Sequence, residues 1–596
     1  MSAQATGRTG RRRSSAAQVR ARKASEAAVV QLQQQNLLAR ISQSDDTLTE
    51  ASFRGRRGSV VANVAPALVM NTTLQSINLA DCAIDDTMMV ELATALRQHP
   101  SLRCLNLLQN QIGDEGAEAL GGALKKNRSL EFLYLSGNQI GPMGGAKLGK
   151  SLKGNDVIRV VYLRRNAVDA DGTAGMAEAL MQRSCKLNTL DLRECCVQAS
   201  GARLLASALK RNSSLTCLYL GKNQLGAEGG SHMAGALKKN RSLQSLYLRD
   251  NAMGAQGCRA IVDALSDNAT LQTLYLGGNV IGRDGASRLA PGLRHCSLTA
   301  LFLGHNDLGD EGIAHICSAL RTNESLQTLN IWGNRLSGVG AEPVAKLLLD
   351  KRSKLQVLDV GLNMLGDEGA LVLAEALEAN EHLEMIFLKS NRICDEGAEA
   401  LAGALKYNTT LDTLQLAANR IGDAGTAALG MALSVNRRLR TLGLAMNPFT
   451  NAGMDALLHG IQHNEVIASV TMRGNMTISP DRQETLHGLL ERNLKWPCEG
   501  QIVPDHEEDK VADRHGISGP NATLKKCRVD TLDSISETPE QILVEAEGES
   551  RSTGSDTGID TVDARNFSAV EQERTQATDQ APASELEQER EQEQSV

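Results

Sequence analysis

A unit of 28 residues repeats from about residue 58 to residue 495, and it limits the possible folds of this chain more than any other feature. The unit is plain in LRCLNLLQNQIGDEGAEALGGALKKNRS (102–129), which is followed by LEFLYLSGNQIGPMGGAKLGKSLKGND (130–156). Its first apolar residue recurs fifteen times, at steps of 28 residues apart from one step of 27 and two of 29. These residues are Leu74, Leu102, Leu130, Ile158, Leu187, Leu215, Leu243, Leu271, Leu298, Leu326, Leu355, Leu383, Leu411, Leu439 and Ile467. So regular a repeat predicts an array of stacked copies, because one copy alone cannot bury its apolar face.

The first half of each unit reads LxxLxLxxNxΦ, where Φ is an apolar residue. Apolar residues at positions four and six alternate with variable ones, which predicts a short strand with one buried face. Position nine is Asn in thirteen units and Cys in the other two, at Cys82 and Cys195. We expect a buried side chain at this position to satisfy backbone groups at the bend after the strand.

The second half of each unit, as in GDEGAEALGGALKKN, has the pattern of a short helix. An acidic residue suits its N-terminus, Ala and Leu recur at helical spacing, and Asn near its end suits a C-terminal turn. Adjacent acidic pairs such as Asp114–Glu115 and Asp367–Glu368 are therefore assigned to helix starts and not to catalysis. Each unit is predicted to be one strand followed by one helix.

The full pattern LxxLxLxxNxΦGDxGAxxLAxAL resembles the leucine-rich-repeat family and is similar to its ribonuclease-inhibitor-like class. Similar repeats occur in cytosolic nucleotide-binding immune receptors and in the activator of the Ran GTPase. The resemblance implies an α/β fold, a right-handed solenoid or horseshoe of about 15 repeats. A parallel sheet would line its concave side and helices its convex side, with fifteen strands lining an inner arc of about 70 Å.

Residues 144–151, GGAKLGKS, match the phosphate-binding pattern G-x-x-x-x-G-K-[ST]. In the repeat register Gly144 corresponds to Gly116, which places the match inside a predicted convex helix. A phosphate-binding loop must follow its strand directly, whereas here the bend at Asn138 and a further turn intervene. We therefore predict no nucleotide site, and we expect no other cofactor, no metal and no catalytic residues.

Position five of the unit, on the solvent-facing side of the predicted strand, gathers most of the aromatic residues. Aromatic residues are only 2% of the chain, yet five of its six tyrosines occupy this column, and Trp332 stands at position seven. The aromatic members of the column are Tyr134, Tyr162, Tyr219, Tyr247, Tyr275, Phe302 and Phe387. Two interpretations are open: contact with a protein partner, since Tyr and Trp are enriched at hot spots, or stacking between neighbouring strands.

Charges on the same predicted face are local and of both signs. They come from units four to seven and comprise Arg164, Arg165, Asp191, Arg193, Glu194, Lys222, Arg249 and Asp250. Mixed signs suit a polar protein contact better than a phosphate track, which requires an uninterrupted basic stripe. The predicted partner-binding residues are therefore the aromatic ones above, together with Trp332, Arg164, Arg193 and Arg249.

Charge is distributed unevenly along the chain. Residues 1–70 carry 11 Lys and Arg against 4 Asp and Glu, a net of +7, whereas residues 501–596 carry 9 against 23, a net of −14. We expect a basic, mostly disordered N-terminal segment over 1–57, a solenoid with terminal caps over 58–495, and an acidic disordered tail over 496–596. The sequence has no signal peptide or membrane-spanning stretch, and its 12 cysteines form no CxxC pair. These features predict a cytoplasmic protein with access to the nucleus.

The favoured function is a non-enzymatic interaction scaffold that binds one or more proteins on its concave face. We expect a monomer, and neither nucleic acid nor membrane as a partner. The alternative is a GTPase-activating protein, because an acidic tail after the repeats is similar to the layout of the Ran GTPase activator. Against that alternative, the repeats here are more uniform and the tail is only moderately acidic.

Overall fold

The structure is a computed structural model that describes residues 32–56, 62–475 and 478–495. Within these residues, sixteen three-residue strands form one sheet, and each strand pairs in parallel with its neighbours in chain order. The strands are β1 (Glu50–Ser52), β2 (Ser76–Asn78), β3 (Cys104–Asn106), β4 (Phe132–Tyr134), β5 (Val160–Tyr162), β6 (Thr189–Asp191), β7 (Cys217–Tyr219), β8 (Ser245–Tyr247), β9 (Thr273–Tyr275), β10 (Ala300–Phe302), β11 (Thr328–Asn330), β12 (Val357–Asp359), β13 (Met385–Phe387), β14 (Thr413–Gln415), β15 (Thr441–Gly443) and β16 (Ser469–Thr471).

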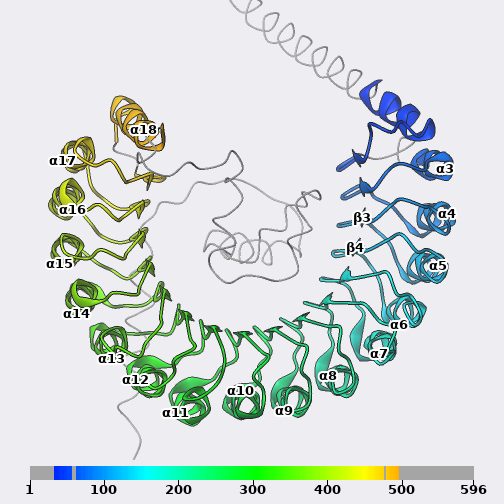
Figure 1. The fold of residues 1–596 in the computed structure, drawn as a ribbon, viewed down its shortest axis with the longest axis horizontal. Helices are drawn as coiled ribbons and strands as arrows, with labels where there is room; N and C mark the ends of the chain where they lie inside the picture. Colours follow the sequence, from blue (N-terminus) through cyan, green and yellow to red (C-terminus); the bar gives the residue numbers. More distant parts are fainter. Residues whose placement is uncertain (1–31, 57–61, 476–477, 496–596) are drawn as a thin grey trace, which may run out of the picture. The chain divides into compact units, whose positions relative to one another are not determined.

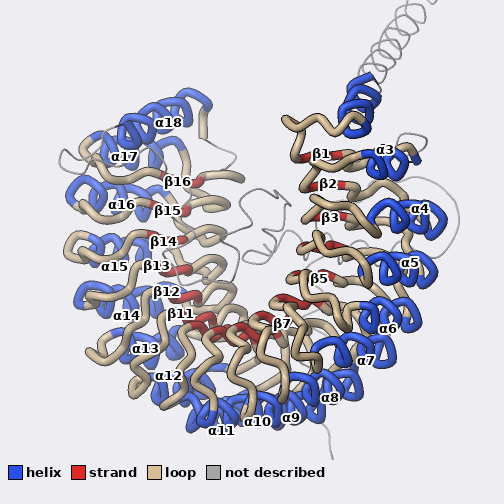
Figure 2. Tube along the Cα trace, turned by 45° about the vertical axis from the view of Figure 1, so that its right-hand side comes forward, coloured by secondary structure: helices blue, strands red, loops and turns tan. Residues whose placement is uncertain are grey.

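From β2 onward a helix follows each strand, and the helices form a layer outside the sheet. The strands line the inner side of the curved array and the helices its outer side, as the sequence predicts (Figures 1 and 2). The helices are α3 (Val64–Met70), α4 (Asp86–Leu96), α5 (Asp114–Leu124), α6 (Pro142–Ser151), α7 (Asp169–Leu180), α8 (Gln198–Leu209), α9 (Gly226–Leu237), α10 (Gly254–Asp263) with the 3-10 turn η1 (Ala264–Asp267), α11 (Gly282–Leu293), α12 (Gly309–Leu320), α13 (Gly338–Leu348), α14 (Gly366–Ala379), α15 (Asp395–Leu405), α16 (Asp423–Val435), α17 (Asn451–Gln462) and α18 (Pro480–Lys495).

The array begins earlier than the predicted boundary at residue 58. Residues 32–42 are helical, and β1 pairs with β2 through Ala51 and Ile77. Ile41 and Phe53 from this stretch are fully buried in the same core as the repeats. The first strand therefore adds to the fifteen predicted ones, and the sequence pattern misses it because its residues lack the LxxLxL spacing.

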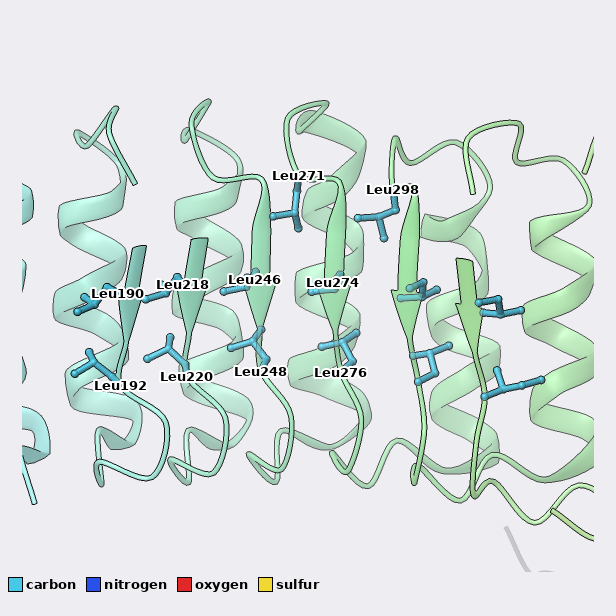
Figure 3. Close-up of a cluster of buried hydrophobic side chains, with 14 of the residues drawn as sticks. Leu190, Leu192, Leu218, Leu220, Leu246, Leu248, Leu271, Leu274, Leu276 and Leu298 are labelled. Atoms are coloured by element: carbon cyan, nitrogen blue, oxygen red, sulfur yellow. The ribbon is translucent and has the colours of Figure 1, made fainter. Parts of the chain in front are cut away.

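Leucines on the buried face of each strand form one continuous core with the helices. Leu246 of β8 lies in register with Leu218 of β7 and Leu274 of β9, and all three are fully buried. Figure 3 shows these side chains, with those two residues further along each strand, pointing from the sheet toward the helix layer. Each buried leucine contributes about 1.5–3 kcal/mol, so the array is stabilised by stacking and not by any one repeat.

The asparagines at position nine form a ladder of hydrogen bonds along the bend after the strands. Asn223 Nδ2 donates to Leu192 O (2.7 Å) and Leu220 O (3.0 Å), while its Oδ1 accepts from the N–H of Cys195 (2.9 Å). Where cysteine replaces asparagine, the thiol of Cys195 donates to Leu163 O (3.1 Å). The prediction that a buried side chain satisfies the bend is confirmed.

A second column of asparagines closes the helix ends. Asn240 Nδ2 donates to Leu209 O of the preceding repeat (2.8 Å), and its Oδ1 accepts from the N–H of Leu243 (2.7 Å). This arrangement recurs at Asn71, Asn127, Asn155, Asn212, Asn268, Asn323, Asn380, Asn408, Asn436 and Asn464. Both asparagine columns thus join each repeat to the one before it.

The acidic pairs lie at helix starts, as predicted, but the first acid of a pair caps the helix of the next repeat. Asp114, at the start of α5, accepts hydrogen bonds through Oδ1 from the N–H groups of Gly141 and Gly144 (both 2.7 Å) at the start of α6. Asp86 and Asp395 cap α5 and α16 in the same way. These carboxylates are engaged in structural contacts between repeats.

Candidate functional site: an aromatic column on the concave face

The parallel register places the aromatic residues of position five side by side on the concave face. Tyr134 pairs with Tyr162, and Tyr219, Tyr247 and Tyr275 pair in series. Because side chains alternate along a strand, these residues point away from the leucine core. The sequence prediction that they share one face and form a line is therefore met by the geometry.

The rings of this column stack on one another. Ring centroids lie 4.1 Å apart for Tyr219–Tyr247, 4.2 Å for Tyr247–Tyr275 and 3.8 Å for Tyr275–Phe302, with interplanar angles of 24°, 16° and 7°. Tyr134 and Tyr162 form a second stacked pair at 5.2 Å. The stacking interpretation left open by the sequence describes these contacts, and the rings from Tyr162 to Phe302 nevertheless remain partly exposed.

The tyrosine hydroxyls are neutral at physiological pH. Burial raises the pKa of Tyr247 to about 12, with further contributions from its charged and polar neighbours. Burial likewise raises the pKa of Tyr162, Tyr219 and Tyr275 above the ordinary value for tyrosine. The column therefore presents an uncharged surface.

Asp191 interrupts the column between Tyr162 and Tyr219. It is fully buried, and Arg193 from the same strand engages it with Nη2–Oδ2 at 2.7 Å and Nε–Oδ1 at 3.1 Å. The guanidinium carbon of Arg193 lies 5.0 Å from the centroid of the Tyr219 ring. Burial alone would lower the pKa of Arg193, but its hydrogen bonds to Asp191 and the charge of that residue raise it overall. The interruption is a buried ion pair, and Tyr162 and Tyr219 approach to 6.3 Å beside it.

The other predicted arginines lie beside the column and also pair with carboxylates. Arg164 and Arg165 both bind Glu194, with Nε–oxygen distances of 2.7 and 2.9 Å. Burial raises the pKa of Glu194, and the hydrogen bonds from Arg165 and Arg164 outweigh that effect and lower it overall. Arg249 Nε lies 3.1 Å from Asp250 Oδ2. The structure thus brings all the predicted arginines together at the carboxyl ends of β5–β8.

Trp332 lies apart from the tyrosine stack. Its indole packs edge-on against His305, with ring centroids 4.1 Å apart. Its Cδ1 is only 2.7 Å from where a Cβ would stand on Gly361, so the ring occupies the space over that glycine. Glycine is required at Gly361 by this close approach, which leaves no open space there.

Phe387 is separated from the stack by Asn330 and Asp359, which occupy position five in β11 and β12. Asn330 Nδ2 donates to Asp359 Oδ2 (2.6 Å), and the N–H of Gly361 donates to Asp359 Oδ1 (2.9 Å). Burial raises the pKa of Asp359 to about 6, although the hydrogen bond from Gly361 and the charge of Lys389 act against that rise. Sequence reasoning missed this pair, for which the only signal was two polar residues in an otherwise aromatic column.

The phosphate-loop match is confirmed to lie in a convex helix. Residues 144–151 belong to α6, where the N–H of Gly144 is already engaged by Asp114. Ser151 is buried and its hydroxyl donates to Lys147 O (2.7 Å), whereas Lys150 is exposed. A phosphate would find neither a free helix N-terminus nor a free hydroxyl at this place.

Over residues 32–56, 62–475 and 478–495, no group of three or more His, Cys, Asp or Glu side chains is arranged to hold a metal ion. No helix in the described part of the chain is long and apolar enough to cross a membrane.

The chain matches the family model described as leucine-rich repeat in twelve segments. They are residues 71–93, 98–121, 126–149, 183–206, 211–234, 239–262, 267–290, 294–317, 322–345, 352–374, 379–402 and 407–430. No curated protein sequence matches the chain.

Three solved structures to which the chain is similar span much of the array. The Rad7–Elc1 complex of yeast is 15% identical and covers 67% of this chain and 90% of its own, with a TM-score of 0.38. The TLR13–ssRNA13 complex is 16% identical, over 70% of this chain and 61% of its own, with a TM-score of 0.37. An internalin, InlF of Listeria monocytogenes, is 15% identical, over 75% of this chain and 86% of its own, with a TM-score of 0.29.

The ribonuclease-inhibitor-like class remains a prediction from the repeat pattern. The family itself follows from the matched segments, the 28-residue period and the single parallel sheet with its outer helices. The chain belongs to the leucine-rich-repeat proteins.

Proposed function

We propose that this chain is a non-enzymatic scaffold and that a partner protein docks on its concave face over β4–β13. The observation that carries the proposal is the stack from Tyr219 to Phe302, which remains partly exposed on a face that no helix covers. Leucine already fills the core on the other side of the sheet, so the fold does not need aromatic residues here. Tyrosine and tryptophan are the residues that most often dominate binding at protein interfaces.

The stacked rings suit docking because they are already fixed. Each ring is held between its neighbours at 3.8–4.2 Å, so a partner has little side-chain motion to arrest. The ion pairs of Arg164, Arg193 and Arg249 border the column and supply polar contacts that can set the partner's register. Trp332 and Phe387 extend the same face beyond the stack.

The test replaces Tyr219, Tyr247 and Tyr275 together by alanine in the full chain. Affinity capture followed by mass spectrometry should lose the partners that the unchanged protein retains, while circular dichroism shows a folded protein. The matched control is Tyr407→Ala, which removes a tyrosine that is 68% exposed and lies next to the end of α15. A second control changes the same three tyrosines to phenylalanine and keeps the stack.

Stacking without docking predicts the opposite result. The alanine variant would then unfold at a lower urea concentration and still capture every partner, and the proposed role of the column would be abandoned. The GTPase-activator alternative rests on the acidic tail and is tested separately. If the unchanged protein accelerates GTP hydrolysis by a Ran-type GTPase, that alternative replaces the scaffold.

A further inference from the structure

We propose that the surface formed by Arg164, Arg165, Arg193, Lys222, Arg249 and the adjacent tyrosine rings selects an acidic segment of the partner protein, rich in Asp and Glu. This inference rests on the proposed function and specifies the chemistry of its partner. The named cations and Asp191, Glu194 and Asp250 give the surface a net charge of +2, from five positive and three negative groups.

The positive groups face solvent more than the negative ones do. The side chain of Arg165 is 49% exposed and that of Glu194, which it binds, is 22% exposed. The side chain of Arg193 is 25% exposed over a fully buried Asp191. The bias is therefore larger than the net charge alone implies, because the carboxylates are covered by the arginines that they hold.

The same bias holds at the ends of this surface. Arg249 is 38% exposed against 29% for Asp250, and Lys222 is an exposed cation from the strand between Arg193 and Arg249. Arg193 also leans toward Gly221, where a Cβ would stand 3.6 Å from Arg193 Cγ. A partner that approaches β5–β8 along the strand ends therefore meets cations first.

The tyrosine stack adds to this preference. Stacking covers the ring faces, which carry the negative part of the aromatic quadrupole, and leaves the ring edges, which carry the positive part. Since burial keeps the hydroxyls uncharged, the column offers no negative charge to repel a carboxylate. Ring edges and guanidinium groups together favour an anionic ligand.

The length of the cationic surface limits what it can bind. It spans β5 to β8, about 15 Å at the usual spacing of strands, and on the next two strands glycine holds the arginine position, at Gly277 and Gly304. An extended peptide covers that distance with about four or five residues. Three carboxylates lie within the surface, so it lacks the unbroken run of cations that a nucleic acid backbone requires. An acidic peptide segment is therefore favoured over a nucleic acid.

The test measures fluorescence anisotropy of short synthetic peptides with the full chain. The peptides carry glutamate, glutamine or lysine at the same positions on one neutral background. We expect the glutamate peptide to bind more tightly than the other two, and more weakly as salt is raised. The double variant Arg165→Glu with Lys222→Glu should weaken that binding by about tenfold or more.

The matched control is Lys238→Glu with Lys239→Glu, which reverses two exposed cations at the end of α9. It should leave binding of the glutamate peptide unchanged. Equal loss in both double variants, or equal binding of the three peptides, would overturn the inference, as would tighter binding of a single-stranded oligothymidine. Failure of this inference is distinct from failure of the scaffold, because partner capture that depends on the tyrosines would survive it.

Discussion

Replacing Asn223 by alanine tests the hydrogen-bond ladder that joins the repeats. The side chain is fully buried and accepts from the N–H groups of Cys195 (2.9 Å) and Val197 (3.2 Å). It donates to Leu192 O and Leu220 O, of which the second keeps a hydrogen bond from Asn251. The variant therefore leaves two N–H groups and one carbonyl without the partner that Asn223 provides.

The expected loss is large. A buried polar group without a partner costs about 1–3 kcal/mol, so three such groups predict a loss of about 3–6 kcal/mol in the free energy of unfolding. That is a substantial share of the roughly 5–15 kcal/mol that stabilises a typical domain. The assay is urea unfolding followed by the helical signal in circular dichroism, with Lys239→Ala as a surface control that should change stability by less than about 0.5 kcal/mol.

Asn223→Cys separates the two halves of the ladder. A thiol at this position can still donate to the carbonyl of the preceding repeat, as Cys195 does to Leu163 O (3.1 Å), but it is a weak acceptor for the two N–H groups. Its stability should lie between those of the unchanged protein and the alanine variant. A loss below about 1 kcal/mol in Asn223→Ala would show that the bend has other partners, and the reasoning would fail.

Two further predictions concern carboxylates. Asp114→Ala should lower the free energy of unfolding by about 1–2 kcal/mol, since it uncaps α6, whereas Glu115→Ala at the neighbouring exposed position should change it by less than about 0.5 kcal/mol, both measured by urea unfolding; equal effects would refute the cap between repeats. Asp359 has a pKa of about 6 when folded, above its ordinary value, so the folded state holds its proton more tightly, and the contribution of this group to stability falls as pH rises from about 4 to about 6. Asp359→Asn should remove that component and raise stability at pH 7 by about 1–2 kcal/mol relative to pH 4, as read from urea midpoints at both pH values; an unchanged pH profile would contradict the assignment.

Much of the fold could be predicted because the repeat tests each assignment many times. A single LxxLxL segment is ambiguous, but fifteen copies in phase leave one interpretation for the leucines and for the asparagines at position nine. The strand β1 could not be found in this way. It enters the sheet through Ala51 and Phe53, whose spacing does not follow the repeat, so only tertiary packing identifies it.

The site was predicted less completely because its contacts run between repeats. The sequence places Tyr219, Tyr247 and Tyr275 in one column, but whether the rings stack or splay depends on the distance between strands and on the side-chain rotamers. The acidic pairs illustrate the same limit. Their position at helix starts was predictable, whereas the capping of the next helix by Asp114 depends on how adjacent helices are offset.

The two faces of each strand separate stability from recognition. Positions four and six bury leucine against the helices, and position five, which points the other way, can change without disturbing that core. Charge can enter the column only with a partner that the same geometry supplies. Asp191 obtains Arg193 from two residues along its own strand, and Asp359 obtains Asn330 from the neighbouring strand. A carboxylate buried there without such a partner would be destabilising by several kcal/mol, so the composition of this face is limited by pairing along and across strands, while the fold is maintained by the leucines and asparagines beneath it.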